Sequence, residues 1–351
     1  VPDDVIPSPH ALLIHQIPPD IHQAQGITEA ELASHLEILI EPKTIVAGYN
    51  SRQFDDRFTQ HIFFRCLRDP YAWQWADGRG RFDLYPVVLT YFLMAPDAIL
   101  WPEDIDGQPR FKLERLGPLN QLDTGLSRAH DASADVIVTA RLARQLAHHD
   151  PDLFADCLKR IEKNFVINLI RSNGRSEGLI EFSSMFGWQS GFARDLWIPF
   201  RLANKTNDYV GFDLSKAPEE VLARLNEIIL RPVEERRSLL NDCGVQIVRA
   251  NAQPMLFRRD ELVGDILKRL SHYGRDIERQ NRNRDVWHDI QESADFKKLY
   301  ELVLLAFEET ERHIDSDVDF DLYSGKFLSP GDRARLKNLS LMDPNHLALF
   351  D

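Results

Sequence analysis

The spacing of apolar residues predicts alternating strands and helices through residues 1–150. A helix is predicted over residues 28–40, where Thr28 and Glu31 have the spacing of a capping box. The run TIVAGY at residues 44–49 predicts a buried strand, and residues 54–67 then repeat apolar side chains at helical spacing. This strand, loop and helix unit is typical of an α/β domain.

Two further helices are predicted, over residues 84–93 and 131–148. The second has the clearer pattern, because Val138, Leu142 and Leu146 form one apolar stripe. Pro151 follows shortly afterwards and predicts both the end of this helix and a domain boundary.

The pattern changes after residue 150. Short strand-like runs at residues 178–182, 197–202, 209–214 and 245–248 predict a small β-rich domain interrupted by helices. The acidic stretch 315–321 indicates a linker, and the last thirty or so residues begin a third unit.

Composition supports more than one domain. With 351 residues, 43% of them hydrophobic, the chain is long for a single core. No apolar run approaches the roughly 20 residues of a membrane helix, so we expect no membrane association. Cys66, Cys157 and Cys243 form no C-x-x-C pair, which fits a reducing cytoplasm. The chain opens on Val1 without a basic and apolar leader, so we expect no signal peptide. It does not begin with Met, from which we expect a missing front end.

The net charge of −13 disfavours a passive electrostatic binder of nucleic acid, which usually has a basic excess. Any DNA must therefore meet a local basic surface. One candidate is the Arg-rich segment 275–284, and solvated helix faces are the alternative interpretation. A second candidate contains Lys159, Arg160, Lys163, Arg171 and Arg175.

Two carboxylates stand where apolar side chains are expected. Asp135 lies at helical spacing from the apolar stripe that begins at Val138. Asp55 lies in the same way on a stripe through Phe58, Ile62 and Cys66. A buried unpaired charge costs several kcal/mol, roughly, so each acid needs a cation, a hydrogen-bond network or an edge position. The alternative is that both only complement helix dipoles from a first turn.

His130 precedes Asp135 by five residues, which on a helix would separate the side chains by about 140°. We therefore place His130 in a loop and Asp135 on the helix. A loop histidine can take a proton from water while a nearby acid holds a metal, although a surface histidine without a role has the same pattern. Small residues separate the two in the string AHDASAD at 129–135.

These strings resemble motifs of the proofreading-type exonucleases. The segment 129–135 resembles their third motif, and GYN at 48–50 with FDD at 54–56 resembles their second. GYNSRQFDD, DPYAWQW (69–75) and WPEDIDGQPRFKLERL (101–116) are similar in order and spacing to the bacterial exodeoxyribonuclease I family. The similarity continues through SMFG (184–187) to LYSG (322–325).

The resemblance implies an α/β fold with three domains. Residues 1–150 would be a ribonuclease-H-like exonuclease domain whose N-terminal strands are missing. Residues 151–308 would contain a small β-barrel of the Src-homology-three type, and residues 319–351 would begin a helical domain. The implied activity is 3′→5′ hydrolysis of single-stranded DNA to nucleoside 5′-monophosphates, in DNA repair and recombination.

The resemblance also implies roles for individual residues. Asp55 and Asp135 match metal-binding acids, and His130 matches the general base beside two Mg²⁺ ions. Tyr71 and Trp75 match positions that face the strand, while Lys112 stands where the family has an arginine that contacts the substrate. The implied partners are single-stranded DNA and the acidic tail of single-stranded DNA-binding protein, and the implied state is a monomer.

One motif departs from the family. Its D-x-E pair is expected ahead of Val1, and the D-I-E at 276–278 lies in a polar, Arg-rich segment that does not replace it. The chain is therefore either part of an active exonuclease or a catalytically inactive protein that binds single-stranded DNA or docks a partner. The second alternative predicts a replacement strand, for which only residues 11–17 are a candidate. Action on RNA is a third possibility, disfavoured by the long second domain.

Overall fold

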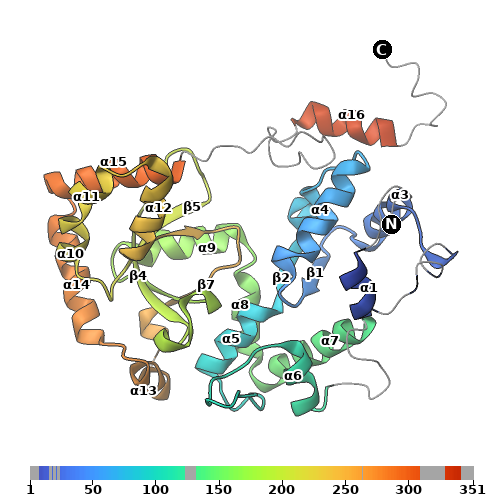
Figure 1. Cartoon of the computed structure of the whole chain (residues 1–351), viewed down its shortest axis with the longest axis horizontal. Coiled ribbons are helices and arrows are strands. Elements are labelled where there is room, and N and C mark those ends of the chain that lie inside the picture. The colour runs from blue at the N-terminus through green and yellow to red at the C-terminus, as the bar shows by residue number, and fades with distance from the viewer. Residues whose placement is uncertain are drawn as a thin grey trace. The chain divides into compact units, whose positions relative to one another are not determined.

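The computed structural model describes residues 8–15, 18, 21, 24–122, 132–262, 264–308 and 329–340 (Figure 1). These residues form two compact units. Unit 1 comprises residues 1–83, 123–140 and 311–351, and unit 2 comprises residues 84–122 and 141–310. Helix α7 contributes its first part to unit 1 and the rest to unit 2.

Unit 1 contains a two-stranded parallel sheet with helices. Its elements are α1 (Pro9–His15), α3 (Glu29–Leu39), β1 (Ile45–Gly48), η1 (Ser51–Gln53), α4 (Asp55–Arg65), η2 (Ala72–Gln74), η3 (Ala76–Gly78), β2 (Gly80–Asp83), the start of α7 (Ala132–His149) and α16 (Pro330–Ser340). Strand β1 pairs with β2 from Ile45 opposite Gly80 to Gly48 opposite Asp83. Helices α3 and α4 pack together around buried Ala33, Ile62, Phe63 and Trp73.

Three predictions in unit 1 can be compared directly. The capping box at Thr28 is confirmed, since its hydroxyl accepts from the Glu31 N–H and the Glu31 carboxylate accepts from the Thr28 N–H. Strand β1 is confirmed, but the prediction that it is buried is wrong, because exposed and half-buried residues alternate along it. The candidate strand at 11–17 is also wrong. Residues 9–15 form helix α1, where Ala11, Leu12 and Leu13 are strong helix formers.

Unit 2 is built around a five-stranded antiparallel sheet of order β6-β5-β4-β3-β7. Its strands are β3 (Leu179–Phe182), β4 (Ala193–Arg201), β5 (Asp208–Asp213), β6 (Val245–Arg249) and β7 (Met255–Arg258). Its helices are α5 (Leu84–Met94), α6 (Leu113–Leu119), the rest of α7, α8 (Pro151–Lys159), α9 (Lys163–Leu169), the π-helical turn η4 (Ile170–Gly174), η5 (Ser184–Phe186), η6 (Trp188–Ser190), α10 (Pro218–Ala223), α11 (Leu225–Ile229), α12 (Val233–Asp242), η7 (Arg259–Glu261), α13 (Asp265–His272), α14 (Ile277–Ile290) and α15 (Ala294–Glu308).

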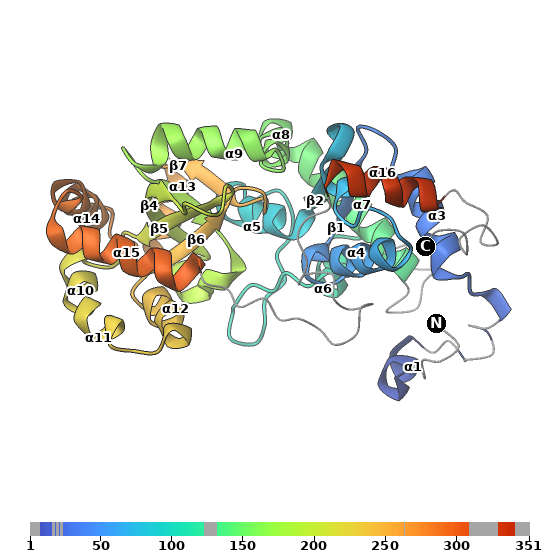
Figure 2. The same ribbon diagram turned by 90° about the horizontal axis from the view of Figure 1, so that it is seen from above.

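Helices cover both faces of this sheet (Figure 2). One face packs Trp197 and Phe212 against Trp287 of α14 and Phe296 of α15. The opposite face packs against α9 and η4, with Leu196 and Ile198 next to Val166 and Ile170. Neighbouring residues of β4 thus point to opposite cores, as strand geometry requires.

All four predicted strands are confirmed, with β4 starting four residues earlier than expected. Two strands, β2 and β7, were not predicted. Over the residues that the structure describes, the sheet is open, with β6 and β7 at its edges, and helices contribute more of this region than the sequence indicated. The predicted linker at 315–321 lies outside the described residues.

A search of the described helices finds none long and apolar enough to cross a membrane.

Candidate active site

The turn from β1 into α4 is fixed by close contacts. A Cβ on Gly48 would lie 2.7 Å from the Ser51 Cβ, so only glycine allows this approach. Asn50 adopts a left-handed conformation with φ of 55°, and its N–H donates to the Asp83 Oδ1 at 2.7 Å. The end of β2 thereby holds the turn that precedes Asp55.

Asp55 and Asp56 form the first turn of α4 but occupy different environments. Asp56 is buried, and its Oδ2 lies 2.7 Å from the Arg81 Nη1 on β2. Asp55 is exposed, and no ion pair to it exists among the described residues. Desolvation raises the pKa of the Asp55 carboxyl, its own N–H lowers it, and the Asp56 charge raises it. Asp55 is therefore the carboxylate that remains available to a cation.

Two aromatic rings accompany Asp55. Phe54 and Phe58 are 72% and 56% exposed, and their rings stack with centroids 6.2 Å apart. The prediction that Phe58 belongs to a buried stripe is wrong, since only Ile62 is fully buried on that stripe and Cys66 is half-buried. Consecutive helical residues diverge by about 100°, so Asp55 and Asp56 could not both have faced the core.

Asp135 lies in the first turn of α7 and is exposed. Val138, Leu142 and Leu146 of the same stripe are buried, as predicted. The carboxylate thus occupies the open edge of the stripe and carries no burial cost, which was one of the alternatives for this residue.

His130 lies outside the described residues, so its position relative to the two acids is not described. Asp55 and Asp135 belong to the same unit. Within the described ranges, no group of three or more His, Cys, Asp or Glu side chains is arranged to hold a metal ion. Carboxylate oxygens are the ligands that Mg²⁺ prefers, and the uncompensated Asp55 fits that chemistry.

The aromatic segment after Pro70 divides into a buried and an exposed part. Trp73 is buried, and its Nε1 donates to the Pro70 carbonyl at 3.0 Å. Tyr71 is half-buried and Trp75 is 58% exposed, with the Arg333 guanidinium 5.7 Å from its ring centroid. The Trp75 ring is accessible for stacking, whereas Tyr71 is only partly so.

Lys112 belongs to unit 2, where it is the N-cap residue of α6. Its side chain is 74% exposed, and its Nζ lies 3.5 Å from the Glu114 carboxylate. An exposed pair at this distance contributes little to stability, so the lysine remains accessible.

The two predicted basic surfaces are only partly on the surface. Arg160 is buried, with its guanidinium 3.8 Å from the Phe257 ring centroid and an ion pair to Asp156. The Arg275 side chain is 7% exposed and pairs with the fully buried Asp195. Both predictions were wrong at these positions, because Arg160 packs against the Phe257 ring and Arg275 pairs with Asp195, and both partners are distant in the sequence.

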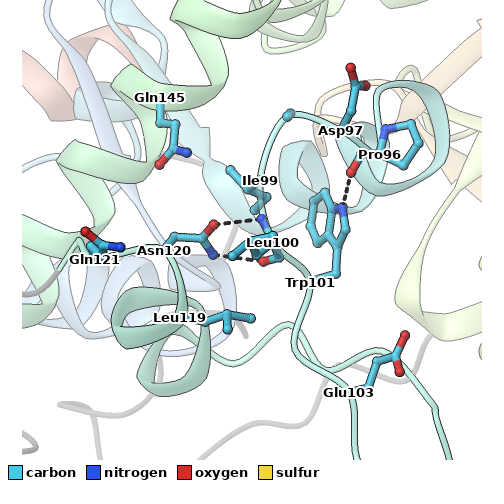
Figure 3. A pocket seen from close by; sticks show the side chains of 11 residues that line it. Pro96, Asp97, Ile99, Leu100, Trp101, Glu103, Leu119, Asn120, Gln121 and Gln145 are labelled. Carbon is cyan, nitrogen blue, oxygen red and sulfur yellow. Dashed lines mark hydrogen bonds between the residues drawn. The ribbon is translucent and has the colours of Figure 1, made fainter.

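A cavity of about 580 Å³ lies in unit 2 between the loop after α5 and the end of α6 (Figure 3). Asn120 holds it open on one side, accepting from the Leu100 N–H and donating to the Leu100 carbonyl. The Trp101 Nε1 donates to the Pro96 carbonyl at 2.6 Å. Asp97 and Glu103 supply its charges, which disfavour a phosphate.

No family model matches the chain. The chain is similar to exodeoxyribonuclease I of Escherichia coli (strain K12), at 32% identity over 358 residues that cover 99% of this chain and 72% of that protein. It is also similar to the crystal structure of E. coli exonuclease I in complex with a dA16 oligonucleotide, with a TM-score of 0.83, 30% identity and the same coverage of both chains. A structure of an ExoI/SSB-Ct complex aligns with a TM-score of 0.81 at 28% identity, over 99% of this chain and 72% of the other.

Proposed function

The chain belongs to the exodeoxyribonuclease I family, and from this premise we propose that it acts as a 3′→5′ exonuclease on single-stranded DNA. The observation that supports this most strongly is the agreement over 99% of the chain with an enzyme bound to an oligonucleotide. The products would be nucleoside 5′-monophosphates, and the setting DNA repair and recombination.

Asp55 and Asp135 are the proposed metal-binding acids, with Mg²⁺ as the ion. Bound magnesium supplies electrostatic stabilisation of both the attacking and the leaving oxygen. His130 accepts the proton of the attacking water, whose oxygen bonds to phosphorus as the bond to the 3′ oxygen breaks. Asp56 does not share this role, because Arg81 already neutralises it.

Substrate binding rests on stacking and on charge. Trp75 presents an exposed ring, and stacking with a base is worth about 1 to 3 kcal/mol whatever the sequence. Phe54 and Phe58 offer a second aromatic surface beside Asp55. Tyr71 is the proposed neighbour of Trp75 on the strand, and Lys112 supplies a point charge for phosphate without the fork of an arginine.

The finer domain assignment is also a proposal. Residues 1–150 form the exonuclease domain, 151–308 the domain related to a Src-homology-three barrel, and 319–351 the start of a helical domain. The sheet supports the second assignment, since β3 to β6 form an antiparallel meander and β7 returns to pair with β3. We also propose a cytoplasmic monomer that docks the acidic tail of single-stranded DNA-binding protein.

End-labelled DNA tests the activity and its direction. In Mg²⁺, we expect a 3′ label to be released at once as a mononucleotide, while a 5′-labelled strand shortens one nucleotide at a time. Internal cuts, or release of the 5′ label first, would contradict the proposal. Binding without any cleavage would favour a catalytically inactive DNA-binding protein. Faster cleavage of RNA than of DNA would favour an exonuclease that acts on RNA.

A further inference from the structure

Three arginines converge on a small cavity in unit 2 that none of the assigned residues uses. The cavity measures about 240 Å³ and lies where η4 meets the end of β4. Arg171 and Arg175 come from η4 and its C-terminal edge, and Arg201 is the last residue of β4. Three arginines from two elements therefore line one opening.

These guanidinium groups carry uncompensated charge. All three residues are exposed, and none is ion-paired within the part of the chain that the structure describes. Other arginines of the same unit are paired, such as Arg284 with Glu177. Arg175 donates from Nε and Nη2 to the neutral Gln291 Oε1, at 3.1 and 2.6 Å, which orients it without neutralising it. In a chain of net charge −13, such a cluster points to an anionic ligand.

The backbone beneath the cavity is irregular at two places. Residues 170–174 form a π-helical turn, and the β4–β5 register shifts between Trp197 and Phe200. A Cβ on Gly174 would lie 3.1 Å from the Ile198 Cβ, so the turn and the strand are in close contact. Single π turns and bulges recur at functional sites because they redirect side chains.

The wall of the cavity is apolar and firmly held. Phe200 is half-buried, with its ring 4.6 Å from that of Tyr300 in an edge contact. Tyr209 also lines the cavity and is buried. The Trp197 Nε1 donates to the Arg175 carbonyl at 2.9 Å, which fixes the backbone that carries one of the arginines.

We propose that this cavity binds a phosphate group of single-stranded DNA, away from the hydrolytic residues. The inference rests on the proposed function for the identity of the ligand. Arginine forks match phosphate oxygens in bidentate geometry, and a neighbouring apolar wall accepts the sugar or base. The volume is below the roughly 300 Å³ at which ligand pockets usually begin, which suits one phosphate with part of its nucleotide.

The test compares two double variants of the whole protein. Arg171→Gln with Arg201→Gln removes two charges from the cavity, and Arg144→Gln with Lys297→Gln removes two from exposed positions on α7 and α15. Binding of fluorescent oligo-dT is measured in chelator, so that no hydrolysis occurs. We expect the cavity variant to bind about tenfold more weakly in about 0.1 M salt. The slope of log K against log salt should fall by about 0.7, the value for one lost phosphate contact on a single strand.

Equal loss of oligo-dT affinity in both variants would mean that only the net charge matters, which would overturn the proposal. Unchanged affinity in the cavity variant would also overturn it. Loss of binding to an acidic peptide, or to thymidine monophosphate, with DNA affinity unchanged would assign the cavity to those ligands instead. Arg201→Lys is a second test should the double variant unfold. It keeps the charge but loses the guanidinium fork, so its affinity for oligo-dT should lie between that of the parent protein and the loss of about tenfold expected of the double variant. Hydrolysis is assayed separately with Mg²⁺, so its absence would contradict the proposed function without deciding the binding result.

Discussion

The buried carboxylate of Asp56 lies 2.7 Å from the guanidinium of Arg81 and joins the first turn of α4 to β2. This pair fixes the helix start at which Asp55 is exposed. The two consecutive acids therefore have different roles. Asp56 pairs with Arg81 and fixes the helix start, whereas Asp55 remains free to bind a cation.

Breaking this pair is expected to destabilise unit 1. Asp56→Asn leaves the Arg81 guanidinium, only 15% exposed, without a counter-charge, and such losses cost about 3 kcal/mol or more. Chemical denaturation measures the free energy of unfolding. The control is Glu29→Gln, which breaks the more exposed pair with Arg65 and should cost about 1 kcal/mol or less. Equal losses in both variants would contradict a structural role for Asp56.

Two neighbouring tryptophans are expected to separate binding from stability. Trp75→Ala removes an exposed ring, so single-stranded DNA should bind about 5- to 150-fold more weakly with little change in the free energy of unfolding. Trp73→Ala empties a buried site and should cost about 3 to 5 kcal/mol of stability. Fluorescence anisotropy and denaturation test both variants. A stable Trp73→Ala, or normal DNA affinity in Trp75→Ala, would contradict this division.

A carboxyl on the sheet of unit 2 predicts a pH dependence of stability. Burial raises the pKa of Glu181 to about 7, while the Arg194 charge and a hydrogen bond from Gln246 lower it. The folded state therefore binds this proton more tightly than the unfolded chain, so its contribution is complete below pH 4.5 and is lost as pH rises through about 7.

Thermal unfolding from pH 4.5 to 7.5 measures this contribution. Glu181→Gln keeps the neutral form and should reduce the loss of stability over that range by about 3 kcal/mol. The exposed Glu292→Gln is the matched control and should follow the parent protein. A pH profile of Glu181→Gln identical to that of the parent would contradict the raised pKa.

Metal removal is expected to separate hydrolysis from binding. A chelator should abolish release of mononucleotides, because the proposed acids cannot alone stabilise the charge that develops on phosphate. Binding of single-stranded DNA should persist, because Trp75 and the exposed cations act without metal. Added Mg²⁺ should restore the rate. Undiminished hydrolysis in chelator would contradict a metal-dependent mechanism.

Local patterns predicted α3, α4, α5 and α7, because capping and apolar periodicity act within a few residues. The box at Thr28 and the α7 stripe are examples. Strands β2 and β7 escaped prediction because each depends on pairing with a strand distant in the sequence, and β2 (GRFD) has a single apolar side chain. The Asp56–Arg81 pair depends on the same register, since Arg81 stands opposite Val46. The partners of charged residues and the exposure of side chains such as Phe58 depend on the tertiary structure, so local sequence patterns do not predict them.

The central claim is that Asp55 belongs to the hydrolytic site, and its most direct test is release of mononucleotides from 3′-labelled single-stranded DNA in Mg²⁺. Asp55→Asn preserves shape and removes one charge, and Glu41→Gln does the same at an exposed position of unit 1. Asp55→Asn is expected to lose at least about a hundredfold in rate, as when a transition-state contact is removed, while binding DNA normally. Glu41→Gln should retain full activity. Full activity in Asp55→Asn would contradict the assignment of this carboxylate as a metal ligand.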